Sequence, residues 1–262
     1  MTERPLALVT GASSGIGAAY ARHLAAQGYD LWLVARRRDL LEALAREMAA
    51  TGAESRIQEG DLSDRRFLAE LSEGVRNEPR LSFLLHNAGF GVHGAVGEAD
   101  PDRLQAMADV HVSATIALCS AAAVGFRQRR SGDVVVVSSI AGWLTGSGSA
   151  TYCATKAFET SFARSLAQEM RPFGVRVQAL CPGWTLTGFH DTPEYAHWSR
   201  SSVPKALWST AEEVVRASWE TLGRGDVCIP GRLNRLVTAV GRAIPVGRIR
   251  DRIRRSRGTG TR

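Results

Sequence analysis

Short apolar runs alternate along the chain with longer stretches that have helical spacing. The runs occupy residues 5–9, 31–35, 55–58, 83–86, 134–138, 175–180 and 227–229. Runs of this length are typical of buried strands, whereas longer amphipathic stretches are typical of helices. Strands that alternate with helices pair in parallel and are covered on both faces. The pattern therefore predicts a doubly wound α/β fold with a mostly parallel seven-stranded sheet and helices on both faces.

The length and composition of the chain agree with one large α/β domain. It has 262 residues, and 44% of them are hydrophobic, which is enough to fill such a core. No linker, low-complexity segment or internal repeat divides residues 1–231. We therefore expect one domain there, followed by a tail at residues 232–262.

A glycine-rich turn follows the first predicted strand and precedes a helical stretch at residues 18–27. It reads Gly11-Ala12-Ser13-Ser14-Gly15-Ile16-Gly17. A strand, such a turn and a helix amino terminus form a cradle for pyrophosphate, because free N–H groups and the helix dipole attract an anion. We expect Gly11 to allow the tight turn, Gly15 to let the phosphates approach, and Gly17 to let the helix pack close to the sheet.

Three polar residues near the middle of the chain form a candidate proton-transfer site. Tyr152 and Lys156 lie one turn apart in a helix expected at residues 151–170, so they share a face. Ser139 ends the run at 134–138 and can face Tyr152. A phenol has a pKa of about 10, which a nearby ammonium lowers. The serine hydroxyl can hold a substrate oxygen while the proton moves.

These motifs, with others in the same order, resemble the short-chain dehydrogenase/reductase family from residue 6 to about residue 229. The further motifs are Asp61-Leu62, Asn87-Ala88-Gly89, and Pro182-Gly183 followed by Thr185 and Thr187. The resemblance implies a Rossmann-like dinucleotide-binding catalytic domain, a nicotinamide cofactor, and hydride transfer between a carbonyl and an alcohol. It also implies a homodimer or a homotetramer.

The resemblance further implies a role for each motif. Tyr152 would be the acid–base, and Lys156 would hold the nicotinamide ribose and lower the tyrosine pKa. Asp61 would contact the adenine, and Asn87 would lie near the ribose. The nicotinamide would be bordered by Pro182, Gly183, Thr185 and Thr187. The glycine turn, Asn87, Ser139 and Pro182 all follow predicted strands, so the motifs should meet at one sheet edge.

The residues after the second predicted strand indicate which nicotinamide cofactor is preferred. The chain reads Arg36-Arg37-Arg38 there, and no carboxylate occurs before Asp39. An NAD site uses an acid for the ribose 2′-hydroxyl, whereas an NADP site needs cations for the 2′-phosphate. Arg36 is best placed to donate two hydrogen bonds to the 2′-phosphate, and Ser13 and Arg37 are candidates for further contacts with it. We predict a preference for NADP(H), with NAD(H) as an alternative.

His111 departs from the pattern of the family that the chain resembles. The family has asparagine at this place, which is thought to hold a water that links the catalytic lysine to solvent. Histidine can also donate and accept, but it is larger and can become charged near neutral pH. Two alternatives follow: His111 replaces the relay and adds a pH dependence, or it blocks the water and slows proton delivery.

Aromatic residues gather after the Asn87 motif, after Ser139 and in residues 184–209, where the resemblance places a substrate lid. Aromatic walls suit a bulky hydrophobic ketone or aldehyde, because they bury a large area with little loss of rotamer freedom. Alternatively, several of them pack the lid against the sheet. The expected substrate-facing residues are Phe90, Trp143, Trp184, Phe189 and Trp198.

The tail carries most of the positive charge of the chain. Residues 232–262 contain ten arginines and one acid, a charge of +9, which leaves −2 for residues 1–231 of the total of +7. We expect the first half of the tail to dock by its apolar face on the enzyme or on a neighbouring subunit. The second half could associate reversibly with an anionic membrane. Nucleic-acid binding is not expected, because the tail has no aromatic residue. The apolar face contains Leu233, Leu236, Val237, Val240 and Ile244.

The sequence gives no sign of secretion or of a metal site. The first strand begins within about five residues, and no run approaches the ~20 apolar residues of a membrane span. The four cysteines have no metal-binding spacing. We expect a cytoplasmic enzyme. A regulator or scaffold that binds NAD(P) without catalysis is the alternative, since a fold does not prove a function.

Overall fold

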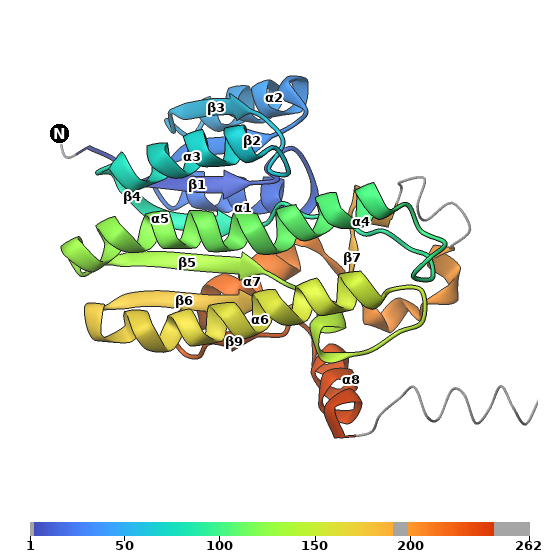
Figure 1. The fold of residues 1–262 in the computed structure, drawn as a ribbon. Helices are drawn as coiled ribbons and strands as arrows, with labels where there is room; N and C mark the ends of the chain where they lie inside the picture. The colour runs from blue at the N-terminus through green and yellow to red at the C-terminus, as the bar shows by residue number, and fades with distance from the viewer. Residues whose placement is uncertain (1–2, 191–198, 244–262) are drawn as a thin grey trace, which may run out of the picture.

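The structure is a computed structural model that describes residues 3–190 and 199–243. A parallel seven-stranded sheet with the order β3-β2-β1-β4-β5-β6-β9 forms its centre (Figure 1). The fold predicted from the sequence is confirmed. The strands are β1 (Leu6–Thr10), β2 (Asp30–Ala35), β3 (Ser55–Glu59), β4 (Leu81–His86), β5 (Gly132–Val137), β6 (Val175–Leu180) and β9 (Val227–Cys228).

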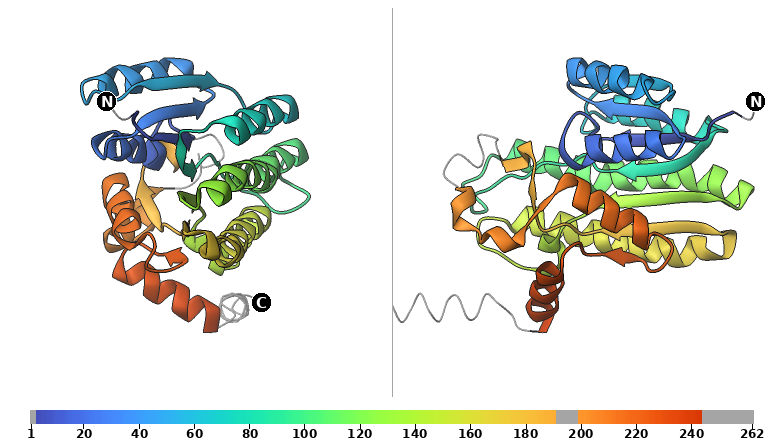
Figure 2. Two further views of the ribbon diagram at one scale, coloured as in Figure 1. Left: turned by 90° about the vertical axis from the view of Figure 1, so that its left-hand side faces the viewer. Right: turned by 180° about the vertical axis from the view of Figure 1, so that it is seen from behind.

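Helices cover both faces of this sheet (Figure 2). Successive strand residues point to opposite faces, so Leu84 joins the core under α3, α5 and α6, and its neighbour Phe83 joins the core under α1, α2 and α7. Each large side chain buried there contributes about 1.5–3 kcal/mol. The helices are α1 (Gly15–Ala26), α2 (Arg38–Ala49), α3 (Arg65–Asn77), α4 (Pro101–Ala108), α5 (Ala114–Arg129), α6 (Ala150–Met170), α7 (Ala211–Thr221) and α8 (Arg232–Ala243).

The strand order reverses between β1 and β4. The chain moves outward from β1 to β3 and then returns to place β4 on the other side of β1. In open parallel sheets, ligands bind in the crevice at such a switch point, beyond the carboxyl ends of the strands. The glycine turn, the Asn87 segment and Ser139 follow β1, β4 and β5, respectively, so all three lie at this edge.

A π-helical turn, η1 (Asp109–Ser113), joins α4 to α5. The resulting helical stretch, Pro101–Arg129, is long and apolar enough to cross a membrane by length and composition, contrary to the expectation from the sequence. Half of its most apolar window is buried in the protein, where α5 packs against α3 and β4. This stretch therefore behaves as a core helix of the fold.

The region expected to be the lid contains a small two-stranded sheet of β7 (Trp184–Leu186) and β8 (Trp208–Thr210). The described residues of this region also contain three short 3₁₀ helices: η4 (Gly188–His190), η6 (Arg200–Ser202) and η7 (Lys205–Leu207). Trp198 lies outside the described residues. The movement of this region as a lid stays a prediction.

Helix α8 contacts the rest of the protein through a different face from the one expected. Asn234 and Thr238 are buried, at 3% and 2% exposure. A Cβ on Gly183 would come within 2.5 Å of the Asn234 side chain, so these residues are in close contact. The apolar stripe, defined here as Leu233, Leu236, Val237 and Val240, is 37–60% exposed. The expectation that this stripe docks on the enzyme itself is therefore wrong. The face that carries Asn234 and Thr238 packs against the enzyme instead, because its small and polar side chains allow the helix to come closer.

Candidate active site

The glycine turn adopts a backbone that side chains would disrupt. Gly11 and Gly15 have φ of +64° and +58°, in the left-handed region that glycine tolerates best. A Cβ on Gly17 would lie 2.3 Å from the carbonyl oxygen of Gly11. Gly17 is thus required by contact with the turn itself, in addition to the packing against the sheet that we expected. Helix α1 begins at Gly15, which leaves its first N–H groups available to an anion.

The ends of β1 and β4 are tied together by Thr10 and Asn87. The Thr10 hydroxyl accepts hydrogen bonds from the N–H groups of Asn87 and Ala88, both at 3.0 Å. The Asn87 amide donates to the carbonyl oxygens of Thr10 and Gly11, at 3.1 and 3.2 Å. Asn87 therefore holds the turn in shape. Thr10 stands at the start of the glycine motif in the sequence, but sequence reasoning assigned it no role of its own.

Two of the predicted arginines border the glycine turn. Arg37 donates to the hydroxyls of Ser13 and Ser14, at 2.8 and 2.7 Å. Arg36 pairs with Asp61 at 3.5 Å and is mostly exposed. Both guanidinium groups remain accessible to an anionic group bound at this edge.

Asp61 is held in its ionised form. Partial burial opposes ionisation, but hydrogen bonds from Ser63 and the charge of Arg36 outweigh it and lower the pKa of the Asp61 carboxyl. Its neighbour Leu62 is buried in the core and fixes the position of this turn. An ionised acceptor therefore stands beside Arg36 at the edge of the site.

The structure brings together the three residues predicted to transfer a proton. Ser139 begins the 3₁₀ helix η2 (Ile140–Trp143), and its hydroxyl accepts a hydrogen bond from the N–H of Ala141 at 3.1 Å. The Tyr152 phenol lies close enough to Ser139 for the serine to lower the pKa of the phenol. The Nζ of Lys156 lies 5.9 Å from the centroid of the Tyr152 ring and donates to the carbonyl oxygen of Val137 at 3.1 Å.

The pKa of Tyr152 differs from the expectation. Burial raises the pKa of the phenol, the hydrogen bond with Ser139 lowers it, and the charge of Glu159 raises it again. The net direction is upward, so the expected lowering is wrong for this structure. At neutral pH Tyr152 is a phenol that can donate a proton.

His111 is fully buried in the π-helical turn. Its Nε2 accepts the N–H of Phe90 at 3.3 Å, so its proton lies on Nδ1, which is 2.9 Å from the Thr155 hydroxyl. Burial, together with the charge of Lys156, holds the pKa of His111 well below its usual value. The expectation that titration of His111 adds a pH dependence near neutral pH is therefore wrong. Its effect on a water relay stays a prediction.

Aromatic rings surround the phenol of Tyr152. Phe90 lies 6.3 Å from His111, His111 lies 5.9 Å from Tyr152, and Tyr152 lies 6.1 Å from Phe189, measured between ring centroids. Phe90 and Phe189 are therefore brought to the site as predicted. The rings of Phe90, His111 and Phe189 therefore form a wall beside the proposed proton donor, Tyr152.

Two predicted substrate residues lie elsewhere. The Trp143 ring lies under the guanidinium of Arg164 at 6.0 Å and packs on the main core, so its assignment to the substrate wall is not supported. Trp184 packs against Trp208 at 5.8 Å across β7 and β8, which matches the alternative that such residues hold the lid region together. Their aromatic character alone could not distinguish core packing from substrate contact.

The segment after β6 passes over the glycine turn. The Pro182 carbonyl oxygen accepts a hydrogen bond from Ile140 N–H at 3.0 Å, and Thr185 is buried, its hydroxyl donating to the Gly183 carbonyl oxygen. A Cβ on Gly15 would lie 3.0 Å from the Thr187 methyl group. These contacts bring the segment to the same edge as the proton-transfer residues.

Glu159 is a site residue that sequence reasoning missed. It is fully buried on α6, and its Oε2 lies 2.9 Å from the Nζ of Lys156. Burial raises the pKa of the carboxyl from 4.5 to about 7, although Lys156 lowers it. The spacing of three residues from Lys156 places both on one helical face and could have revealed the pair.

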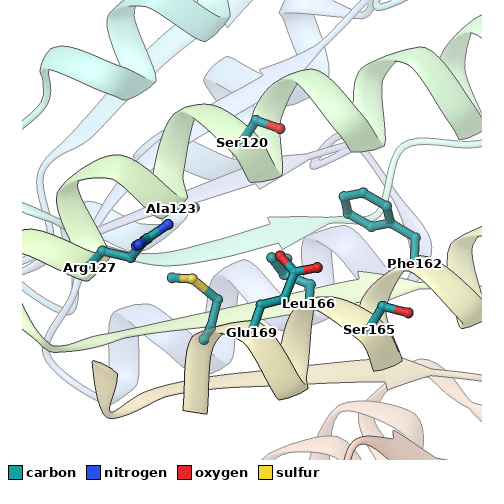
Figure 3. Close-up of a pocket in the computed structure, with 8 residues that line it drawn as sticks. Ser120, Ala123, Arg127, Phe162, Ser165, Leu166 and Glu169 are labelled. Atoms are coloured by element: carbon teal, nitrogen blue, oxygen red, sulfur yellow. The ribbon is translucent and has the colours of Figure 1, made fainter. Parts of the chain in front are cut away.

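Other parts of the described chain offer less chemistry. A shallow hollow of ≈ 190 Å³ lies between α5 and α6 (Figure 3), but it contains none of the converging residues. No group of three or more His, Cys, Asp or Glu side chains that could hold a metal ion occurs in residues 3–190 and 199–243. The edge beyond β1, β4 and β5 is therefore the candidate active site.

Comparison with known proteins identifies the family. Residues 5–195 match the short chain dehydrogenase family. The chain belongs to this family. It is an oxidoreductase that acts on alcohol and carbonyl groups.

Similar proteins extend over almost the whole of this short chain dehydrogenase. A short-chain dehydrogenase from Sphingobium yanoikuyae in complex with NADPH is 30% identical, with a TM-score of 0.81 and coverage of 98% of this chain and 96% of that one. The bulky-bulky ketone specific alcohol dehydrogenase from Comamonas testosteroni is 29% identical, with a TM-score of 0.77 and coverage of 100% and 96%. A 7beta-hydroxysteroid dehydrogenase from Clostridium sardiniense is 29% identical over 231 residues, 87% of this chain and 86% of the relative.

Proposed function

We propose that this short chain dehydrogenase is an NADPH-dependent reductase of bulky hydrophobic ketones or aldehydes, and that the reaction is reversible. One observation carries the proposal: Ser139, Tyr152 and Lys156 meet at the carboxyl ends of the strands, beside the glycine turn. The nicotinamide would supply the hydride. Ser139 would hold the carbonyl oxygen, and Tyr152 would donate the proton to it.

The residues present fit such a cofactor. The glycine turn and the amino terminus of α1 would hold the pyrophosphate, because the first N–H groups of a helix have no partner within the helix. Lys156 would hold the nicotinamide ribose, and Asp61 with Leu62 would border the adenine. Asn87, Ala88 and Gly89 would support the ribose, with Pro182, Gly183, Thr185 and Thr187 beside the nicotinamide.

The proposed preference for NADP(H) over NAD(H) rests on the two arginines at the turn. Arg37 donates hydrogen bonds to the hydroxyls of Ser13 and Ser14, and its neighbour Arg36 is exposed. Guanidinium groups suit a phosphate because they donate paired hydrogen bonds. The Sphingobium yanoikuyae neighbour, which is in complex with NADPH, supports the same preference.

We expect Arg36→Ala to lower the ratio of NADPH affinity to NADH affinity by about tenfold, since a hydrogen bond to a charged group contributes about 1.5–3 kcal/mol. Fluorescence titration with each cofactor measures the ratio. Arg38→Ala is the matched control, because Arg38 pairs with Glu42 one turn further along α2. An unchanged ratio in Arg36→Ala would contradict the role of Arg36.

The hydrophobic substrate is supported by the rings of Phe90, Tyr152 and Phe189 and by the neutral His111 between them. The bulky-bulky ketone specific neighbour from Comamonas testosteroni is consistent with this class. A panel of carbonyl compounds with NADPH tests the proposal. We expect aromatic and long-chain ketones to be reduced faster than small polar ones. The opposite order would contradict the proposed substrate class. Tight NADPH binding without any turnover would favour the alternative function, a regulator or scaffold that binds NAD(P) without catalysis.

We also propose that α8 is a docking surface for an anionic lipid membrane. Its apolar stripe is exposed, and the exposed Arg232 and Arg235 flank it. Residues 232–262 carry a charge of +9, which complements an anionic surface. Helix α8 also touches Gly183 and packs near Leu144, so a lipid surface there would lie close to the active-site loops. The enzyme would thus be cytoplasmic with peripheral membrane contact.

Vesicle co-sedimentation of the full chain tests this surface. We expect Leu236→Ser with Val240→Ser to weaken binding to phosphatidylglycerol vesicles by about tenfold or more, because each apolar side chain loses up to about 1.5–3 kcal/mol of burial. Leu40→Ser, on α2, is the control for an exposed apolar residue elsewhere. Equal binding by the stripe variant, or equal binding to neutral vesicles, would contradict the proposal. A change in oligomeric size in the stripe variant, with vesicle binding retained, would assign the stripe to a second copy instead.

The homodimer or homotetramer implied by the family resemblance remains part of the proposal. Ile116 on α5 is 43% exposed, and the hollow between α5 and α6 lies on the outer surface of the same helices. Light scattering of the purified protein measures the number of subunits directly.

A further inference from the structure

Glu159 is a fully buried carboxylate that lies beside the proposed catalytic lysine, Lys156. Glu159 has no exposed surface, and Lys156 is only 4% exposed. Their side chains approach to 2.9 Å between Oε2 and Nζ. Neither carboxylate oxygen of Glu159 has a hydrogen-bond partner among the described residues, so the contact with Lys156 is an ion pair. A buried carboxylate costs several kcal/mol unless it is paired, so Lys156 is the group that allows Glu159 to remain ionised there.

The pairing affects the position of Lys156. Its ammonium donates a hydrogen bond to the Val137 carbonyl oxygen at 3.1 Å and forms an ion pair with the Glu159 carboxylate at 2.9 Å. These lie on β5 and α6, so the Lys156 side chain is fixed between the strand that leads to Ser139 and the helix that carries Tyr152. Removing Glu159 would leave a single acceptor.

The pairing also affects the charge that Tyr152 experiences. An isolated ammonium near a phenol favours the phenolate, whereas a neutral ion pair largely cancels that effect. The charge of Glu159 raises the pKa of Tyr152, as it does for the thiols of Cys119 and Cys181. The ionisable groups that face the pair from α5, β6, η1 and β4 are Cys119, Cys181, His111 and His86.

Once the pH rises above about 7, where Glu159 is ionised, these neighbours leave Glu159 as the anionic group beside Lys156. Burial, followed by the charge of Lys156, lowers the pKa of both His86 and His111, so both are neutral. Burial raises the pKa of both cysteines, so both remain thiols. The charge near Tyr152 therefore depends mainly on Lys156 and Glu159. Cys153, next to Tyr152, also acts on the phenol, but burial raises the pKa of its thiol.

We propose that Glu159 is a positioning residue that fixes Lys156 and offsets its charge, so that Tyr152 stays protonated and ready to donate to a carbonyl. The inference rests on the proposed reductase function and deepens it. In carbonyl reduction the phenol gives its proton to the substrate oxygen, whereas in alcohol oxidation the phenolate takes the proton from the hydroxyl. Glu159 would thus extend the pH range of reduction upward and delay oxidation to higher pH.

The first test is the titration of Tyr152 in the complex with NADP⁺, followed by phenolate absorbance in the near ultraviolet. The signal of Tyr152→Phe in each background is subtracted. In Glu159→Gln we expect Tyr152 to ionise about one pH unit lower than in the parent, a tenfold change in its ionisation constant. The high-pH limb of alcohol oxidation should shift in the same direction. An unchanged titration would overturn the proposal.

The controls separate this effect from a structural one. Glu169→Gln changes an exposed carboxylate on the same helix and should leave the titration unchanged. If Glu159→Gln does not fold, Glu159→Met removes the charge with a similar volume, and the same shift is expected. The absorbance titration needs no turnover, so it reports on Glu159 even if the assigned substrate class is wrong.

A second measurement uses the unfolding temperature as a function of pH. The folded-state pKa of Glu159 is raised from 4.5 to about 7, so its contribution to stability is full below about pH 4.5 and is lost as the pH rises through 7. Between about pH 4.5 and pH 7 we expect the unfolding temperature of the parent to fall more than that of Glu159→Gln or Glu159→Met, whichever folds. Parallel curves would show that Glu159 is not a buried ionising group and would overturn the proposal.

Discussion

Tyr152→Phe should lower kcat for carbonyl reduction by about a hundredfold to ten-thousandfold, the range that a positioned acid–base group contributes. The substitution removes only the phenolic oxygen, which lies near Ser139. The ring contacts with His111 and Phe189 remain. Cofactor affinity and folding should therefore change little. Steady-state kinetics and NADPH titration of the same preparation measure both quantities.

Tyr20→Phe is the matched control for this prediction. Tyr20 is also buried, and its hydroxyl is hydrogen-bonded to Ser218 at 2.9 Å, away from the candidate site. Its loss should cost about 1 kcal/mol of stability, the typical contribution of one hydrogen bond, and leave kcat unchanged. If Tyr152→Phe kept its turnover within about threefold of the parent, the role of Tyr152 as the proton donor would be wrong.

Gly17→Ala should weaken NADPH binding by about fivefold to a hundredfold. The added Cβ would lie 2.3 Å from the Gly11 carbonyl oxygen and 2.5 Å from the Asn87 amide nitrogen. The carbonyl belongs to the backbone and cannot rotate away, so the turn must open. Overpacking of this kind costs about 1–3 kcal/mol, and the distorted turn no longer presents its N–H groups to the phosphates. Calorimetric titration with NADPH measures the loss.

Gly225→Ala provides the comparison. An added Cβ at Gly225 meets no atom within 4 Å, and its φ is not in the left-handed region. Its NADPH affinity should equal that of the parent. Unchanged affinity in Gly17→Ala would mean that the turn is not the pyrophosphate cradle. Thermal unfolding of both variants separates a loss of cofactor affinity from a loss of folding.

The pattern of apolar runs was enough to predict the fold, because strand and helix periods depend on local sequence. Each run became a strand whose bounds differ by at most two residues from the prediction, and β6 has the predicted bounds. The convergence of Ser139, Tyr152 and Lys156 was also predictable. It follows from helical spacing and from the rule that parallel strands end at one sheet edge.

Side-chain direction and electrostatic environment were decided only by the tertiary structure. Trp143 and Phe90 are both aromatic, but only packing directs Trp143 to Arg164 and Phe90 to His111. The apolar stripe of α8 was visible in the sequence, yet the contact between Asn234 and Gly183 determines that this stripe faces outward.

The ionisation of the candidate site depends on burial, which no local pattern encodes. The sequence contains Tyr152 and Lys156 at the right spacing, and from it we expected a lowered tyrosine pKa. The fold buries Tyr152 and places the Glu159 carboxylate on Lys156, and both effects raise that pKa. The sequence by itself thus determined the fold and the family, and it indicated the candidate proton-transfer residues. The tertiary structure decided their charge states, because desolvation and ion pairing depend on residues that only folding brings together.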